Sequence, residues 1–151
     1  MASNSELLEL YSSLRRNISL EATSSLKELG FSLRQFLILR NLGRRGPLTM
    51  TTLAEHCMTD AATISRSVSQ LIEQQYARKL QCPEDGRVFR AELTAKGAKL
   101  LPELDRLHGE LADQCFGHLS AEEKKLLTKT LKKVVEYIEA GRAPAAAGEG
   151  A

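Results

Sequence analysis

Hydrogen-bonding side chains gather in two short stretches of this sequence. The first, AATISRS (61–67), combines small residues and hydroxyl groups with one arginine, and the second, EDGRVFR (84–90), places an aspartate and an arginine around a glycine. A guanidinium can bond O6 and N7 of a guanine together, and the negative potential of a narrow DNA minor groove attracts arginine. These residue types therefore favour recognition of a nucleic acid over catalysis.

The charge distribution points to the same class of partner. Residues 40–99 contain ten Lys and Arg against six Asp and Glu, a balance of +4, whereas the rest of the chain contains eleven against thirteen, a balance of −2. A basic segment in a nearly neutral chain indicates a polyanionic partner, although ordinary surface charge would give a similar count.

Other classes of protein are disfavoured. No run approaches the roughly eighteen apolar residues of a membrane span, and the start of the chain does not resemble a secretory signal. The widely spaced Cys57, Cys82 and Cys115 argue against a disulfide framework, so we expect a cytoplasmic protein. The sequence shows no Gly-rich phosphate loop and no Ser/His/Asp or Cys/His pairing of suggestive spacing, which predicts that it is not an enzyme. Cys115 and His118 alone are too few ligands for a metal, so we expect neither a metal nor another cofactor.

Helices must position the two stretches. Apolar residues recur every three or four positions through most of the chain, which predicts six helices. The predicted helices cover about 5–30, 33–42, 49–57, 61–75, 95–119 and 121–140. Residues able to cap five of them are Ser32, Thr49, Asp60 or Thr59, Thr94, and Ser120 with Glu123.

A hairpin interrupts this helical pattern. ARKLQ (77–81) and VFRAEL (88–93) alternate as strands, and CPEDG (82–86) forms the turn between them. The alternation predicts that Phe89, Ala91 and Leu93 face the core, and that Val88, Arg90 and Glu92 face outward. We expect Gly86 to take a backbone angle that other residues resist, and Asp85 to hold the turn by pairing with a nearby arginine.

The order of these elements is that of a DNA-binding motif. A short helix, a turn of about four residues around Cys57 to Asp60 and a second helix with small polar residues at its start form the helix-turn-helix pattern. A hairpin directly after the second helix is typical of a wing. The candidate DNA-binding residues are Ala62, Thr63, Ser65, Arg66, Ser69 and Gln70 on the helix, and Arg78, Asp85, Arg87 and Arg90 on the hairpin. We expect Arg66 to contact a base and Arg87 to enter the minor groove.

The chain resembles the MarR-type regulators, bacterial winged-helix repressors named for multiple antibiotic resistance. EDGRVFRAELTAKG resembles the wing signature of that family, and LAEHCMTDAATISRSVSQLIEQQYARK resembles its helix-turn-helix. The resemblance extends from about Leu7 to Ile138. It places the wing aspartate and arginine of the family on Asp85 and Arg87, and its recognition-helix positions on Ala62, Thr63, Arg66 and Gln70.

The resemblance implies a homodimer that represses transcription from a pseudo-palindromic operator. Many members release DNA when a small phenolic or other lipophilic compound binds, or when a cysteine is oxidised. The plausible lining of an effector pocket is Tyr11, Arg15, Arg16, Phe31, Phe36, His108 and Phe116. This chain departs from the family at Gln75, where most members end the recognition helix with glycine, and at Gly86, where a basic residue often precedes the wing arginine.

We therefore expect a mainly α fold with a small β-hairpin wing. A single MarR-like domain should cover residues 1–141, with a winged helix-turn-helix core over about 32–94 and dimerisation helices over about 5–30 and 95–140. Residues 142–151 lack large side chains and should form a disordered tail. The alternatives are a repressor that responds to cysteine oxidation and a winged helix that binds proteins without DNA.

Overall fold

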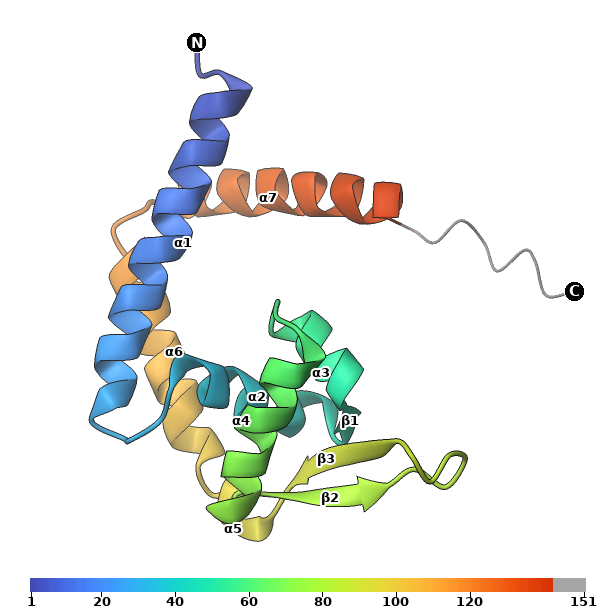
Figure 1. Ribbon diagram of the computed structural model, residues 1–151. Helices are drawn as coiled ribbons and strands as arrows, with labels where there is room; N and C mark the ends of the chain where they lie inside the picture. Colours follow the sequence, from blue (N-terminus) through green and yellow to red (C-terminus); the bar gives the residue numbers. More distant parts are fainter. Residues whose placement is uncertain (143–151) are drawn as a thin grey trace, which may run out of the picture. The chain divides into compact units, whose positions relative to one another are not determined.

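The computed structural model describes residues 1–142, so the predicted tail lies outside the described residues except for Arg142. The elements are α1 (Asn4–Lys27), α2 (Leu33–Arg45), β1 (Leu48–Thr49), α3 (Met50–His56), α4 (Ala61–Glu73), β2 (Ala77–Gln81), β3 (Phe89–Leu93), α5 (Ala95–Ala98), α6 (Leu101–Phe116) and α7 (Ala121–Arg142) (Figure 1). The expected mainly α fold with a small β wing is confirmed. The elements fall into two compact units, Met1–Leu111 and the chain from Ala112 onward. Within residues 1–142, no helix is long and apolar enough to cross a membrane.

The predicted caps fix the starts of the helices. Ser32 and Gln35 form a reciprocal capping box at α2, and Ser120 and Glu123 exchange the same pair of bonds before α7. Single side-chain caps precede three further helices: Thr49 before α3, Asp60 before α4 and Thr94 before α5. These bonds satisfy backbone N–H groups that have no partner within the first turn of a helix.

The sheet has one strand more than the predicted hairpin. Its order is β1-β3-β2, with β3 antiparallel to both neighbours, and Leu48 of β1 opposite Ala91 of β3. Two residues are too few to show an alternating pattern, so no local signal predicts β1. As predicted, Ala91 is buried and Arg90 is exposed.

A single apolar core in the first unit holds the sheet and the helices around it. The fully buried large side chains are Leu26, Ile38, Leu39, Leu53, Ile64, Val68, Leu71 and Leu104. Three of them come from α4 at spacings of four and three residues, which turns one face of that helix inward and leaves the opposite face to solvent. Each such side chain stabilises the fold by about 1.5–3 kcal/mol.

The prediction of one continuous helix over residues 95–119 is wrong. This segment is divided into α5 and α6 by a turn at Lys99 and Leu100. Pro102 lies in the first turn of α6, where its missing N–H is tolerated but where it cannot continue the hydrogen bonds of a preceding helix. The N–H of Leu100 bonds three residues back, to the carbonyl of Gly97.

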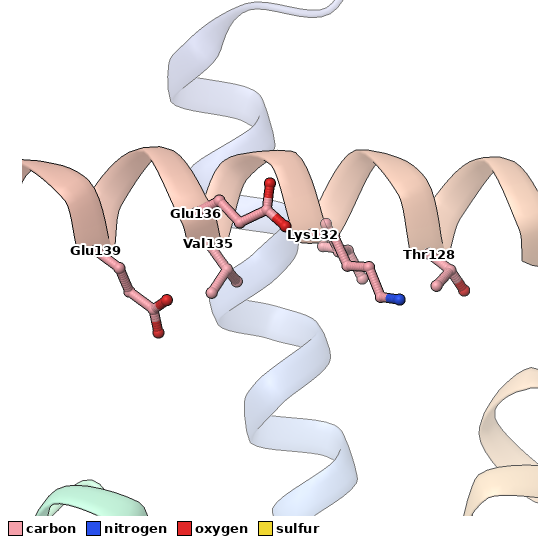
Figure 2. Close-up of a pocket in the computed structure, with 6 residues that line it drawn as sticks. Thr128, Lys132, Val135, Glu136 and Glu139 are labelled. Carbon is pink, nitrogen blue, oxygen red and sulfur yellow. The ribbon is translucent and has the colours of Figure 1, made fainter.

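In the second unit, α7 has no buried residue among those described. Leu127, Leu131, Val134 and Ile138 are between 36% and 49% exposed. A shallow hollow runs along this helix, and Figure 2 shows the side chains of Thr128, Lys132, Val135 and Glu139 pointing to one side of it. All residues that line the hollow belong to α7, so it is an open helix surface.

Candidate nucleic-acid interface

The C-terminus of α4 is fixed by a left-handed residue. Gln75 has a φ of 65°, and hydrogen bonds run from its N–H to the carbonyl of Ile72 and from the N–H of Tyr76 to that of Leu71. This pair of bonds is the Schellman ending of a helix, in which glycine usually takes the left-handed position. Gln75 therefore adopts the conformation that we expected a glycine to take at the end of this helix. Met58, with a φ of 54°, ends α3 in the same way.

Two side chains from the start of α5 hold this helix end. The Thr94 hydroxyl donates to the carbonyl of Gln75 at 2.6 Å, and the Lys96 ammonium donates to that of Gln74 at 2.8 Å and lies 4.4 Å from the centre of the Tyr76 ring. We call Thr94 and Lys96 the helix clamp. A cation near the C-terminus of a helix also interacts favourably with the helix dipole.

Gly97 allows α5 to approach closely enough for the clamp to form. A Cβ atom at Gly97 would lie 2.1 Å from the carbonyl oxygen of Tyr76, which also accepts the N–H of Thr94. This is the glycine that follows Leu-Thr in the stretch EDGRVFRAELTAKG. Its role is therefore close backbone contact at the junction between α4 and β2.

The outward face of α4 carries the predicted contact residues. Ala62, Arg66, Ser69 and Gln70 are exposed, while Thr63 and Ser65 are half-buried beside them. Spacings of three and four residues keep most of this group on one side of the helix, opposite Ile64, Val68 and Leu71. The structure thus brings most of the helix candidates together on one surface, with Ser65 at its edge.

A chain of hydrogen bonds crosses the first turn of α4. Asp60 accepts the N–H and the hydroxyl of Thr63, both at 2.7 Å, and the Thr63 hydroxyl accepts Nη2 of Arg66 at 3.3 Å. The hydrogen bonds from Thr63 lower the pKa of Asp60, and the charge of Arg66 lowers it further. The carboxylate is therefore ionised at neutral pH.

The wing tip is ordered through its backbone. The Asp85 carboxylate accepts the N–H of Arg87 at 3.0 Å, and the Asp85 carbonyl accepts the N–H of Val88. The expected pairing of Asp85 with an arginine side chain is wrong for the described residues, because a short carboxylate two positions before an N–H reaches that group directly.

Gly86 also differs from the prediction. Its φ lies outside the left-handed region, where Gly30 and Gly46 are found. Its carbonyl accepts Nε2 of Gln81 at 3.2 Å, and a Cβ at Gly86 would lie 3.2 Å from the same nitrogen. The position is tight because of the Gln81 side chain and imposes no unusual backbone angle.

The remaining candidates lie along the hairpin. Arg78 forms an ion pair with Glu92 directly across β2 and β3, and Arg90 lies opposite Leu80 on the same face. Lys79, on the other face, lies 4.4 Å from the centre of the Phe89 ring. Glu92 thus holds Arg78 in place from the neighbouring strand. Strand alternation alone indicates which face each side chain lies on, but not this ion pair.

Known proteins share both the sequence and the fold of this chain. The MarR family model matches residues 31–89. YxaD, an HTH-type transcriptional regulator of Bacillus subtilis, is 30% identical over 127 residues, which are 83% of this chain and 87% of that protein. This chain belongs to the MarR family. MhqR, another HTH-type regulator of that organism, is 25% identical over 79% of this chain and 82% of its own length.

MarR proteins of known structure have the same winged fold with terminal helices. The MarR protein of Peptoclostridium difficile DA00132 matches with a TM-score of 0.83 and 24% identity over 93% of this chain and 92% of that chain. A cysteine-to-serine mutant of Escherichia coli MarR, solved with operator DNA, matches with a TM-score of 0.75 and 24% identity over 85% of this chain and 92% of its own. MarR proteins are winged helix-turn-helix transcriptional regulators and not enzymes.

The residues predicted to line a MarR effector pocket do not converge in the first unit. Tyr11, Arg15 and Arg16 are exposed on α1, whereas Phe31 and Phe36 are buried in the core. The His108 side chain is largely exposed on α6. Desolvation by the surrounding protein, and then the charges of Arg40 and Arg44, lower its pKa. Phe116 is half-buried near the end of α6. The effector pocket stays a prediction.

The cavity beside α1 in the first unit is small. It has a volume of about 10 Å³ and is lined by Leu26, Phe36, Leu107 and neighbouring residues of α1 and α6. This is room for about one water molecule and not for a phenolic compound.

The three cysteines have different surroundings. Burial raises the pKa of the Cys57 thiol, and Arg34 offsets part of that rise. Cys82 is buried beside the wing, and Cys115 is half-buried on α6. A protonated, partly buried thiol is a poor nucleophile, so the structure gives Cys57 no feature of a redox sensor. Within residues 1–142, no group of three or more His, Cys, Asp or Glu could hold a metal ion.

Proposed function

We propose that this MarR protein is a homodimeric cytoplasmic repressor that binds a pseudo-palindromic operator and is released by a small phenolic or lipophilic effector. The observation that carries the proposal is the exposure of Arg66 on α4 and Arg87 on the wing, both in the same compact unit. Escherichia coli MarR has been solved with operator DNA, and IacR of Pseudomonas putida, 23% identical to this chain, is a transcriptional repressor. Both likenesses support the same function here.

Each element has a distinct part in this proposal. The polar face of α4 enters the major groove, where the Arg66 guanidinium bonds a guanine and Thr63, Ser69 and Gln70 lie near neighbouring bases. Arg78 and Arg90 contact phosphates along the wing, and Arg87 enters the minor groove. Phosphate contacts supply affinity that falls with salt, whereas base contacts supply the sequence preference.

The dimer rests on apolar faces that a single protomer leaves uncovered. On α1, Leu7, Leu10 and Leu14 are between 42% and 59% exposed. The apolar stripe of α7, formed by Leu127, Leu131, Val134 and Ile138, is similarly exposed. A second copy would bury these faces, and two-fold symmetry would then set two recognition helices about one DNA turn, roughly 34 Å, apart.

Binding to genomic DNA fragments at two salt concentrations tests the core of the proposal. We expect selected fragments to stay bound at the higher salt, while binding to other fragments is lost. Equal loss from all fragments would exclude specific DNA recognition and would favour the alternative of a protein-binding winged helix.

Removing residues 120–151 tests the role of the dimer. We expect this truncation to give a monomer that no longer binds the operator, because it removes the apolar stripe of α7. Removing only residues 143–151 is the matched control and should change neither property. A truncated monomer that bound the full operator normally would overturn the two-fold mechanism.

The proposed effector would bind at the surface of α1. Tyr11 and Arg15 are exposed one helical turn apart, which offers an aromatic ring and a guanidinium to the same small molecule. A lipophilic phenol or aromatic acid fits that pair. Titration of the protein–operator complex with such compounds, using Arg15→Ala as the comparison, would show release in the parent protein alone.

A further inference from the structure

The start of α4 holds more hydrogen bonds than a helix cap needs. Asp60 caps the helix by accepting the backbone N–H of Thr63 through one carboxylate oxygen. Its other oxygen accepts the Thr63 hydroxyl at 2.7 Å, and the same hydroxyl lies 3.3 Å from Nη2 of Arg66. A side-chain path therefore runs from the cap to the guanidinium.

The direction of each bond in this path is determined. A carboxylate only accepts hydrogen bonds and a guanidinium only donates them, so the single hydroxyl hydrogen of Thr63 must point to Asp60. The oxygen of Thr63 then presents a lone pair to Arg66. In this state the Thr63 hydroxyl cannot donate to O6 or N7 of guanine or to O4 of thymine, which are acceptors in the major groove.

We propose that Thr63 is a positioning residue that orients Arg66 for base recognition and that its hydroxyl donates no hydrogen bond to a base. This inference rests on the proposed function, because it concerns the DNA contact of α4. An arginine side chain that is already ordered loses less conformational freedom on binding than a free one does. Asp60 is the anchor of this arrangement, which explains why an acid stands at the start of a DNA-facing helix.

Two substitutions separate the hydroxyl from the shape of Thr63. Thr63→Val keeps the branched side chain and the backbone N–H that Asp60 caps, but it removes the hydroxyl. Thr63→Ser keeps the hydroxyl and removes the methyl group. Melting of each variant without DNA would show whether the helix cap is preserved.

The test uses the DNA duplex that the parent protein selects from a randomised pool. The affinity of Thr63→Val and of Thr63→Ser for this duplex is measured with Arg66 intact and in the Arg66→Ala background. We expect Thr63→Val to weaken binding about fivefold with Arg66 present and by less than about twofold in its absence. Thr63→Ser should bind like the parent. The base preference of Thr63→Val should relax at the same base pair as that of Arg66→Ala.

Equal losses in both backgrounds would overturn the inference, because Thr63 would then contact DNA directly. Loss in neither background would overturn it as well. NMR relaxation of the Arg66 side chain without DNA provides a separate test, since Thr63→Val should raise its mobility and Thr63→Ser should not. If the parent protein selects no sequence from the pool, the proposed function fails, and the relaxation result still decides whether Thr63 orders Arg66.

Discussion

The first turn of α4 and the tip of the wing each combine an aspartate with an exposed arginine, but they order that arginine differently. On α4, Asp60 and Thr63 reach the guanidinium of Arg66 through side chains. On the wing, Asp85 bonds the backbone N–H of Arg87, and within residues 1–142 the Arg87 guanidinium makes neither a hydrogen bond nor an ion pair. An arginine that reads one base gains from a fixed direction, whereas one that enters a groove of variable width gains from freedom.

The two regions meet at the junction between α4 and β2. Tyr76 connects the end of α4 to the start of β2, and its carbonyl accepts the N–H of Thr94. Thr94 and Lys96 hold the last carbonyls of α4. The helix clamp therefore lies where α4 meets the two strands of the wing.

The broadest effect should come from Gly97→Ala, which acts on both regions together. The added Cβ would meet the Tyr76 carbonyl at 2.1 Å, so the helix clamp must shift. We expect the free energy of unfolding, measured with denaturant, to fall by about 1–3 kcal/mol, as in other overpacked sites. Gly109→Ala is the matched control, because no atom lies within 4 Å of the new Cβ and a helix interior favours alanine. A neutral Gly97→Ala would show that the clamp tolerates movement.

Arg87→Ala should break the wing region alone. We expect a loss of operator affinity of about 2–3 kcal/mol, with a change in the free energy of unfolding below about 0.5 kcal/mol because the side chain is exposed. Lys27→Ala removes the same charge from the end of α1 and serves as the control. Operator affinity within about twofold of the parent at near-physiological salt would exclude a minor-groove role for Arg87.

Arg66→Ala should change preference as well as affinity. We expect a loss on the order of 1–3 kcal/mol, concentrated at one base pair in each half-site. Measuring affinity for single-base variants of the operator distinguishes the possibilities, since a uniform loss across all variants would make Arg66 a phosphate contact. The contrast with Arg87 would then disappear.

The smallest effect should come from Gln75→Gly at the junction between α4 and β2. A left-handed angle is unfavourable for glutamine and free of steric strain for glycine, so we expect the free energy of unfolding to rise by at most about 1 kcal/mol. Gly86→Ala is the informative comparison, because Gly86 lies outside the left-handed region and its Cβ would meet only the flexible end of the Gln81 side chain, so alanine there should be nearly neutral. A destabilised Gln75→Gly would mean that the glutamine side chain contributes a contact of its own.

Much of the fold could be predicted from local sequence signals. The caps at Ser32, Thr49, Asp60 and Thr94 are short-range hydrogen bonds, and the strand faces follow from alternation, so both were accessible without a structure. The prediction missed the break before α6 although Pro102 signals it, because a proline is tolerated only in the first turn of a helix. The two residues of β1 became a strand only through pairing with β3, a contact distant in sequence.

The residues of the candidate site could be predicted from the sequence, but the hydrogen bonds between them could not. The residues on α4 and the wing could be named because residue types and helical spacing select them. The hydrogen bonds from Arg66 to Thr63 and from Lys96 to Gln74 depend on rotamers and on tertiary approach, which spacing does not determine. Sequence likewise could not show that Phe31 and Phe36 are core residues, since an aromatic side chain suits a pocket and a core equally well.

The ring beneath Lys96 gives the helix clamp a spectroscopic signature. The Lys96 ammonium lies 4.4 Å from the centre of the Tyr76 ring, so the adjoining methylene protons experience the ring current of the tyrosine. Protons above the face of an aromatic ring are shielded, and the Lys96 side-chain signals should therefore resonate upfield of those from other lysines. That upfield shift would report in solution whether Lys96 holds the end of α4, with DNA bound or without it.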